Sequence, residues 1–213
     1  MLYLANPSSP AVRDAMRRGE LGQMCTPAEG RAPLDGVLHA RDNGCFSKKG
    51  YPGEEKWLAW LEAGVEHADR CLFAVAPDVF NPDLGDEMGL ASLARSRPWL
   101  PVIRSLGYPA ALVAQNGLLP EDVPWDEIDW IFIGGTTEWK LSQAASTLAA
   151  AAKAHGKGVH MGRVNSARRW AIAEVFGADT CDGTFIARAP DTNLARQQRW
   201  PTHNLFASER TPA

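Results

Sequence analysis

Three aspartates, Asp42, Asp78 and Asp182, each follow a short apolar run that predicts a buried strand. Cleavage of a glycosidic bond builds positive charge on the sugar, and a carboxylate on the far face of that sugar can bond to it covalently. Asp182 is predicted to be this nucleophile, and Asp42 is predicted to transfer the protons. Asp179 is the alternative nucleophile. In an extended segment Asp179 and Asp182 face opposite sides, so only one of them is expected to enter a pocket.

Polar groups at other predicted strand ends suit the recognition of a flat heterocyclic base. A guanine-like base offers N1–H and an exocyclic amine on one edge, and the Asp78 carboxylate can accept from both. The base carbonyl needs donors, which the Gln115 amide and the backbone N–H groups of Gly134 and Gly135 can supply. Each residue alone fits an ordinary turn or helix cap. Their recurrence at successive strand ends favours a binding site.

Basic residues flank the predicted mouth of this site. They are Lys48, Lys49, Arg163 and Arg168, the last followed by Arg169. Phosphate contact and a solvated helix face are about equally compatible with their positions. The formal net charge of -3 gives no bulk attraction for nucleic acid, so any such contact must be local.

The intervening segments predict alternating strands and helices. The strand-like runs are Leu2–Leu4, Val37–Arg41, Cys71–Ala76, Ala110–Ala114, Trp130–Ile133, Gly158–Met161 and Ala178–Cys181. Helical patterns begin after Ser9-Pro10 and cover Glu54–Ala68, Thr137–His155 and Ser166–Phe176. This rhythm predicts an α/β fold, a compact TIM-like (β/α) barrel of seven or eight parallel strands. The eighth strand is expected from Thr184–Ala187, or it is missing.

We expect a single catalytic barrel over residues 1–190 and a C-terminal tail over 191–213 that packs on the barrel, with a disordered end. The sequence lacks a membrane-length apolar run and a signal-peptide pattern, and its four widely spaced cysteines favour free thiols in a reducing cytoplasm. Close Cys or His pairs and glycine-rich phosphate loops are also absent, so no metal and no nucleotide cofactor are expected.

From about Asp42 to Arg188, the order of these motifs resembles the queuine/archaeosine tRNA-guanine transglycosylases. Asp42-Asn43-Gly44-Cys45-Phe46 is similar to their Asp-Ser-Gly-Gly-Phe, Gln115-Asn116-Gly117 to Gln-Gly-Gly, Gly134-Gly135 with the downstream Glu138 to Gly-Gly-Leu with its Glu, His160-Met161-Gly162 to Leu-Met-Gly, and the segment 177–182 to Gly-Val-Asp-Met-Phe-Asp. The resemblance implies that Asp182 is the nucleophile and Asp42 the general base. It also implies that the base is bound by Asp78, Gln115, Gly134, Gly135, Met161 and Phe46.

The zinc site of that family, Cys-x-Cys-x-x-Cys with a later His, is absent from the sequence. The chain therefore looks closest to the short deazapurine DNA-modification transglycosylases of phages and bacteria, the DpdA family. This resemblance implies a pentosyltransferase that exchanges guanine in DNA for a free 7-deazaguanine base, such as 7-cyano-7-deazaguanine. It implies no metal, no nucleotide cofactor and no ATP.

Three alternatives stay open at this stage. One is a tRNA-guanine transglycosylase without its zinc region, with tRNA in place of DNA. Another is a barrel that binds deazaguanine or nucleic acid without turnover, although binding alone needs neither Asp42 nor Asp182. The last is a lyase or hydrolase for a small sugar or nucleoside, which the amide and the diglycine at the base position disfavour.

Overall fold

The computed structural model describes residues 1–30, 32–46 and 50–200. In this part of the chain eight parallel strands close into a barrel in sequence order. They are β1 (Leu2–Ala5), β2 (Gly22–Cys25), β3 (His39–Arg41), β4 (Cys71–Val75), β5 (Ala110–Ala114), β6 (Trp130–Ile133), β7 (Gly158–Met161) and β8 (Thr180–Asp182). The barrel closes because β1 pairs with β8, with Leu4 opposite Asp182. The predicted α/β barrel is confirmed.

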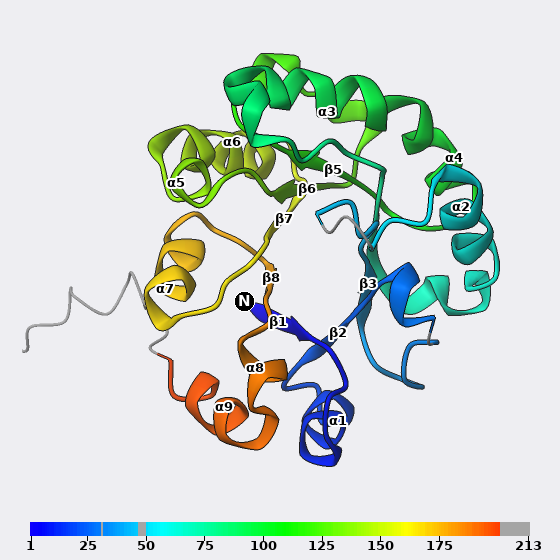
Figure 1. Ribbon diagram of the computed structural model, residues 1–213, viewed down its shortest axis with the longest axis vertical. Coiled ribbons are helices and arrows are strands. Elements are labelled where there is room, and N and C mark those ends of the chain that lie inside the picture. The colour runs from blue at the N-terminus through cyan, green and yellow to red at the C-terminus, as the bar shows by residue number, and fades with distance from the viewer. Residues whose placement is uncertain (31, 47–49, 201–213) are drawn as a thin grey trace, which may run out of the picture.

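Helices surround the barrel (Figure 1). They are α1 (Pro10–Arg17), α2 (Glu54–Glu62), α3 (Met88–Ser96), α4 (Leu100–Ser105), α5 (Thr137–Lys140), α6 (Gln143–Ala154), α7 (Ala167–Val175), α8 (Phe185–Arg188) and α9 (Pro190–Gln197). Short 3-10 helices cover Pro27–Glu29, Val65–Arg70, Pro82–Glu87, Arg97–Trp99, Pro120–Asp122 and Trp125–Glu127. None of the described helices has the length and apolar character that crossing a bilayer requires.

The eighth strand is β2, not Thr184–Ala187, so that prediction is wrong. The segment after β8 forms α8 instead. The hydropathy pattern does not reveal β2, because the first half of this strand is glycine and glutamine and therefore lacks apolar side chains. Gln23 is nevertheless buried, because its side-chain oxygen accepts a hydrogen bond from the Leu34 backbone N–H at 2.9 Å. That bond offsets the cost of burying an amide.

Two predicted helices are shorter than their patterns. The first ends at Glu62, and Gly64 then lies so close to the Arg41 guanidinium that a side chain there would clash with it. The Ala-rich segment is divided by Leu141 and Ser142 into α5 and α6. This division turns the last residue of α5, Lys140, into the protein interior, where it is fully buried.

The core has two layers, as expected of a strand barrel inside a helix ring. The barrel interior holds a small apolar cluster that includes Leu4, Phe73 and Val113. A larger cluster fills the space between strands and helices. α9 packs beside α1 and α8 (Figure 1), and Ser9 donates a hydrogen bond to Asp191 at 2.7 Å. The first part of the expected tail is thus covered by α9, whereas residues 201–213 lie outside the described residues.

Candidate active site

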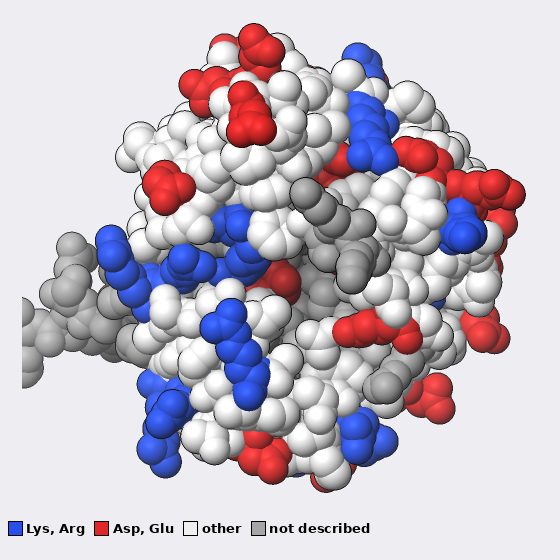
Figure 2. All heavy atoms as spheres, in the orientation of Figure 1, with Lys and Arg blue, Asp and Glu red and all other residues white. Residues whose placement is uncertain are grey.

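The loops that follow β3 to β8 enclose a pocket of about 410 Å³ at the carboxyl ends of the strands. Figure 2 shows it as a hollow near the middle of this face, with acidic atoms inside and basic side chains beside it. Its lining includes Asp42, Asn43, Phe46, Asp78, Phe80, Gln115, Gly134, Gly135, Arg163, Asn165, Asp182, Thr184 and Arg188. Side chains that are up to 146 residues apart in sequence, as Asp42 and Arg188 are, thus line one cavity.

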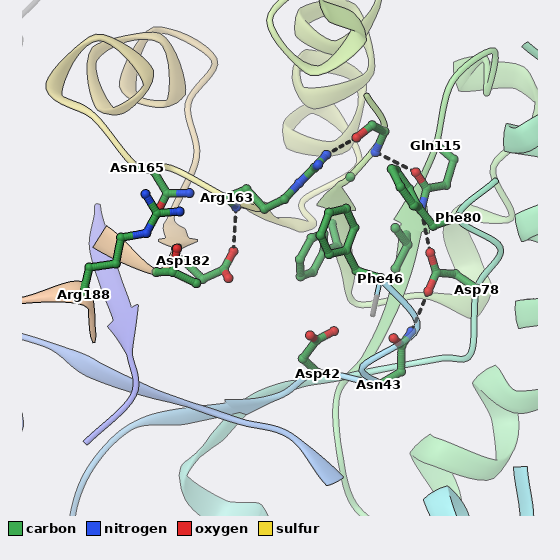
Figure 3. A pocket seen from close by; sticks show the side chains of 16 residues that line it. Asp42, Asn43, Phe46, Asp78, Phe80, Gln115, Arg163, Asn165, Asp182 and Arg188 are labelled. Atoms are coloured by element: carbon green, nitrogen blue, oxygen red, sulfur yellow. Dashed lines mark hydrogen bonds between the residues drawn. The ribbon is translucent and has the colours of Figure 1, made fainter. Parts of the chain in front are cut away.

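One end of the pocket, here called the amide end, is formed by Asn43, Asp78 and Gln115 (Figure 3). Asn43 donates to Asp78 Oδ1 at 2.8 Å, and Gln115 donates to Asp78 Oδ2 at 2.5 Å. Burial raises the pKa of Asp78, although both amide hydrogen bonds act to lower it. Each carboxylate oxygen keeps a lone pair for a ligand N–H group, because a carboxylate has about four acceptor positions.

The predicted role of the diglycine as a pair of backbone donors is not supported. Gly134 N–H donates to the Ala114 carbonyl oxygen at 2.9 Å, and Gly135 N–H donates to Gln115 Oε1 at 2.6 Å. Both donors are used inside the protein, since strand pairing continues through Gly134 and the Gln115 amide needs a fixed orientation. The glycines still line the pocket, and Gly135 adopts a φ of 65°, which favours glycine.

The opposite side of the pocket holds Asp182, the last residue of β8. Its Oδ1 accepts hydrogen bonds from the Arg163 backbone N–H at 3.0 Å and from His160 Nε2 at 3.2 Å. Burial acts to raise the pKa of Asp182, but these donors and the nearby cations hold it below its usual value. Because both bonds fall on Oδ1, the other oxygen, Oδ2, is the one left to contact a substrate.

His160 is fully buried inside the barrel, and its pKa is lowered because burial disfavours the charged imidazolium. Its Nδ1 lies 2.8 Å from the Thr180 hydroxyl on the neighbouring strand. A neutral ring with its proton on Nε2 fits this network, because Thr180 can then donate to Nδ1 while Nε2 donates to Asp182. His160 thus orients the carboxylate and does not face the ligand.

Asp42 enters the pocket from the loop after β3, facing the space between Asp78 and Asp182 (Figure 3). Burial and the charges of those two carboxylates raise the pKa of Asp42 to about 7. A carboxyl group that titrates near neutral pH can both donate and accept a proton in a catalytic cycle.

The raised pKa of Asp42 predicts a pH-dependent stability. The folded protein binds this proton more tightly than the unfolded chain does, so the free energy of unfolding should fall as pH rises from about 4 through 7. Asp42→Asn should therefore stabilise the protein by about 4 kcal/mol at about pH 8, with little gain near pH 4. Urea denaturation of both proteins at each pH measures this. The surface variant Asp14→Asn serves as control, and equal gains at both pH values would contradict the raised pKa.

Two aromatic rings and one arginine form the rim of the pocket. The Phe46 and Phe80 ring centroids lie 4.7 Å apart. The Arg163 guanidinium lies 4.5 Å from the Phe46 centroid and donates a short hydrogen bond to the Gly135 carbonyl oxygen. Arg163 has a φ of 59°, the left-handed region that residues other than glycine rarely adopt. This backbone turn aims its N–H at Asp182 and its side chain across the pocket.

Two other predicted site residues, Met161 and Arg168, do not line the pocket. Met161 is fully buried between the strands and the helices, because side chains alternate along β7 and His160 faces inward. Arg168 lies on the outside of α7 beside a shallow groove. Lys48 and Lys49 lie outside the described residues.

The alternative nucleophile, Asp179, lies before the opposite end of β8. It forms an ion pair with Lys153 at 2.6 Å and accepts a hydrogen bond from the Val159 N–H at 2.9 Å. Neither this carboxylate nor its partners line the pocket. The geometry therefore favours Asp182 over Asp179 as the acid that meets a ligand.

Sequence reasoning missed Phe80 and Asn165, which lie in loops after strands, and Arg188, the last residue of α8. Applying the strand-end rule to every loop could have found Asn165 after β7 and Arg188 after β8. Phe80 and Lys140 carry no comparable pattern. Among the described residues, no group of three or more His, Cys, Asp or Glu side chains is placed to hold a metal ion.

No model of a known protein family matches the chain, and no curated protein matches it. A solved structure that matches is that of an Agrobacterium tumefaciens protein described as a glycerophosphoryl diester phosphodiesterase, with 15% sequence identity and a TM-score of 0.42. The match covers 76% of this chain and 60% of that one, so the chain spans less than two thirds of the length of that protein.

Proposed function

We propose that the protein is a base-exchange enzyme of the guanine transglycosylase type, which acts on DNA in the cytoplasm and inserts a 7-deazaguanine. The observation that carries the proposal is the meeting of Asp42, Asp78 and Asp182 in one pocket, each in a different environment. Asp182 has a lowered pKa, Asp42 titrates near neutrality, and Asp78 is held by two amides. These are the properties of a nucleophile, a proton carrier and a base-binding acceptor.

In the first half-reaction, guanine at the amide end donates hydrogen bonds from N1–H and the exocyclic amine to Asp78. Asp182 Oδ2 attacks C1′ of the sugar, and the bond from C1′ to N9 breaks. Protonated Asp42 gives its proton to the departing guanine, which leaves as a neutral base. The product is a sugar bound covalently to Asp182 and an ionised Asp42.

In the second half-reaction, a free 7-deazaguanine takes the place of guanine at the amide end. Its N9–H passes a proton to Asp42, and N9 attacks C1′ while the bond from C1′ to Asp182 breaks. Two inversions give overall retention at C1′. Asp42 regains its proton and Asp182 its charge, so the cycle needs no metal, nucleotide cofactor or ATP.

The other end of the pocket supports a nucleotide substrate over a free nucleoside. Asn165 and Arg188 line this cationic end, beside Asp182 and across from Asp78 (Figure 3), and Thr184 also lines the pocket. A base at Asp78 with its C1′ at Asp182 directs the sugar and its phosphate towards Arg188. A guanidinium with neighbouring amide and hydroxyl groups is well suited to phosphate oxygens.

Positive surface charge extends outward from the cationic end of the pocket. Figure 2 shows Lys and Arg side chains gathered over α7 and α8, on one side of the hollow. A nucleic acid strand that follows this side would carry its phosphates past Arg188 and Arg169. The target nucleotide must leave the base stack to reach the pocket, so the substrate is melted or flipped DNA.

Arg188→Gln should weaken binding of single-stranded DNA several-fold and reduce the slope of log affinity against log salt by about 0.7. The loss arises because one fewer counterion is released when the strand binds. Fluorescence anisotropy over a series of salt concentrations measures the slope. Arg17→Gln, at the exposed end of α1, should leave it unchanged. If the slope is the same in Arg188→Gln as in the wild type, the cationic end does not contact DNA phosphates.

The direct test is exchange of labelled guanine. Duplex DNA, single-stranded DNA and tRNA, each labelled at guanine, are incubated with the protein and 7-cyano-7-deazaguanine, and label release and nucleoside masses are measured. The proposal predicts release from DNA with incorporation of the deazaguanine. Release from tRNA alone would favour the tRNA enzyme, and tight base binding without release from any polymer would favour the binding barrel.

A further inference from the structure

Lys140 is a fully buried cation at the end of α5. Its Nζ donates to the Gly162 carbonyl oxygen at 2.6 Å, an acceptor that carries no formal charge. Burying an ammonium group against a neutral partner costs more free energy than burying an apolar side chain of the same size. Nothing in the base-exchange mechanism above uses this residue, so its position calls for another explanation.

The Gly162 carbonyl belongs to the same peptide unit as the Arg163 N–H. That N–H donates to Asp182 Oδ1 at 3.0 Å. In a planar trans peptide the C=O and N–H bonds point in opposite directions. Lys140 therefore lies at one end of this peptide dipole and Asp182 at the other. A cation on the carbonyl polarises the peptide and makes its N–H a stronger donor.

The backbone around this peptide is held from several sides. The left-handed conformation of Arg163 is disfavoured for a residue with a side chain. Arg169 donates to the Arg163 carbonyl oxygen at 3.1 Å, while the Arg163 side chain donates to Gly135. With Lys140 on the preceding carbonyl, the Gly162–Arg163 peptide is fixed with its N–H towards Asp182.

We propose that Lys140 is a positioning residue that acts on Asp182 through the Gly162–Arg163 peptide, stabilising the ionised carboxylate without touching it or the substrate. The kinetic consequence rests on the proposed function. When Asp182 leaves the sugar in the second half-reaction it regains its negative charge, and the polarised N–H stabilises that charge. Lys140 should therefore speed the breakdown of the covalent intermediate.

The effect should depend on pH. Burial and the charges of Arg163 and Arg169 lower the pKa of Lys140 to about 7, while the charge of Asp182 opposes this shift. The ammonium form is complete below this value and is lost as pH rises through it. The stabilisation of the Asp182 anion through the peptide should weaken over the same range.

The relay can be tested without any activity, by NMR titration of the Asp42→Asn variant, which removes the other pocket group with a pKa of about 7. We expect the Arg163 backbone amide resonance to shift with the same midpoint as the Lys140 side-chain nitrogen. Adding Lys140→Gln, which keeps a donor but loses the charge, should remove that step, whereas adding the matched change Lys153→Gln should keep it. An Arg163 amide that stays flat while Lys140 titrates would overturn the proposal. The Asp42→Asn titration decides even if the variant with Lys140→Gln does not fold.

A second experiment measures the lifetime of the covalent adduct between Asp182 and DNA. In Lys140→Gln the covalent adduct should persist about tenfold longer than in the wild type at about pH 6, a size typical of residues that orient a reacting group. The difference should shrink above about pH 8, where Lys140 is neutral in the wild type. An equal slowing at all pH values would indicate a purely structural role. A failed exchange assay with a positive NMR result would instead reject the reaction and keep the relay.

Discussion

Replacing Asp182 by Asn should abolish base exchange, with a loss of at least about 10⁴-fold in turnover, as is typical when a residue of the central catalytic unit is removed. The reason is that an amide cannot form the covalent bond to C1′ and cannot carry the charge that stabilises the sugar cation. The covalent complex with DNA should disappear with it. Denaturing electrophoresis and intact mass measurement detect that complex directly.

The matched control is Asp179→Asn, because Asp179 lies near the opposite end of β8 in an ion pair with Lys153. This variant should keep both the adduct and the turnover, apart from a small loss of stability. An adduct that survives in Asp182→Asn and is lost in Asp179→Asn would reverse the assignment. Persistence of the adduct in both variants would show that neither aspartate is the nucleophile.

Replacing Asp78 by Asn should lower kcat/KM for guanine exchange by roughly 10²–10³-fold, because one of the two acceptor oxygens for the base is lost and the other becomes a neutral amide oxygen. The amide nitrogen that the substitution introduces would also face the Asn43 or the Gln115 amide, both of which donate at this site. One of these donors would then lack an acceptor. Calorimetry with the free base should show the same loss in affinity.

Asp129→Asn is the control for this prediction, because Asp129 pairs with Arg104 outside the pocket. Its kcat/KM should stay within a few-fold of the wild-type value. Thermal unfolding separates a binding defect from a folding defect. If Asp78→Asn is stable and still binds guanine with the wild-type affinity, the amide end is not the base site.

Much of the architecture could be predicted from the strand ends. Asp42, Asp78 and Asp182 each follow an apolar run, and parallel strands bring their carboxyl ends to one face of a barrel. Their shared pocket therefore follows from the order of the elements, without knowledge of side-chain contacts. The β2 strand could not be recognised in this way, because Gln23 is buried by a single hydrogen bond that no hydropathy pattern records.

The roles of individual side chains were harder to predict, because they depend on the direction of single side chains and on which internal hydrogen bonds they form. The sequence predicts that Met161 contacts the bound nucleobase. Because His160 faces the barrel interior and side chains alternate along β7, Met161 instead packs in the core between strands and helices. The sequence predicts that the Gly135 N–H binds a ligand, but it donates its hydrogen bond to Gln115 Oε1 instead. Lys140 could not be predicted at all, since its burial depends on where a helix is interrupted.

The pairing of β1 with β8 links the placement of Asp182 to the order in which the protein folds. Asp182 stands opposite Leu4, so the strand that carries it is held on one side by a segment synthesised nearly the whole length of the barrel earlier. Contacts this distant in sequence form late and slowly. During synthesis the emerging chain therefore carries Asp42 and Asp78 without an aligned Asp182. In the proposed reaction, attack on a sugar therefore requires that β1 has already paired with β8.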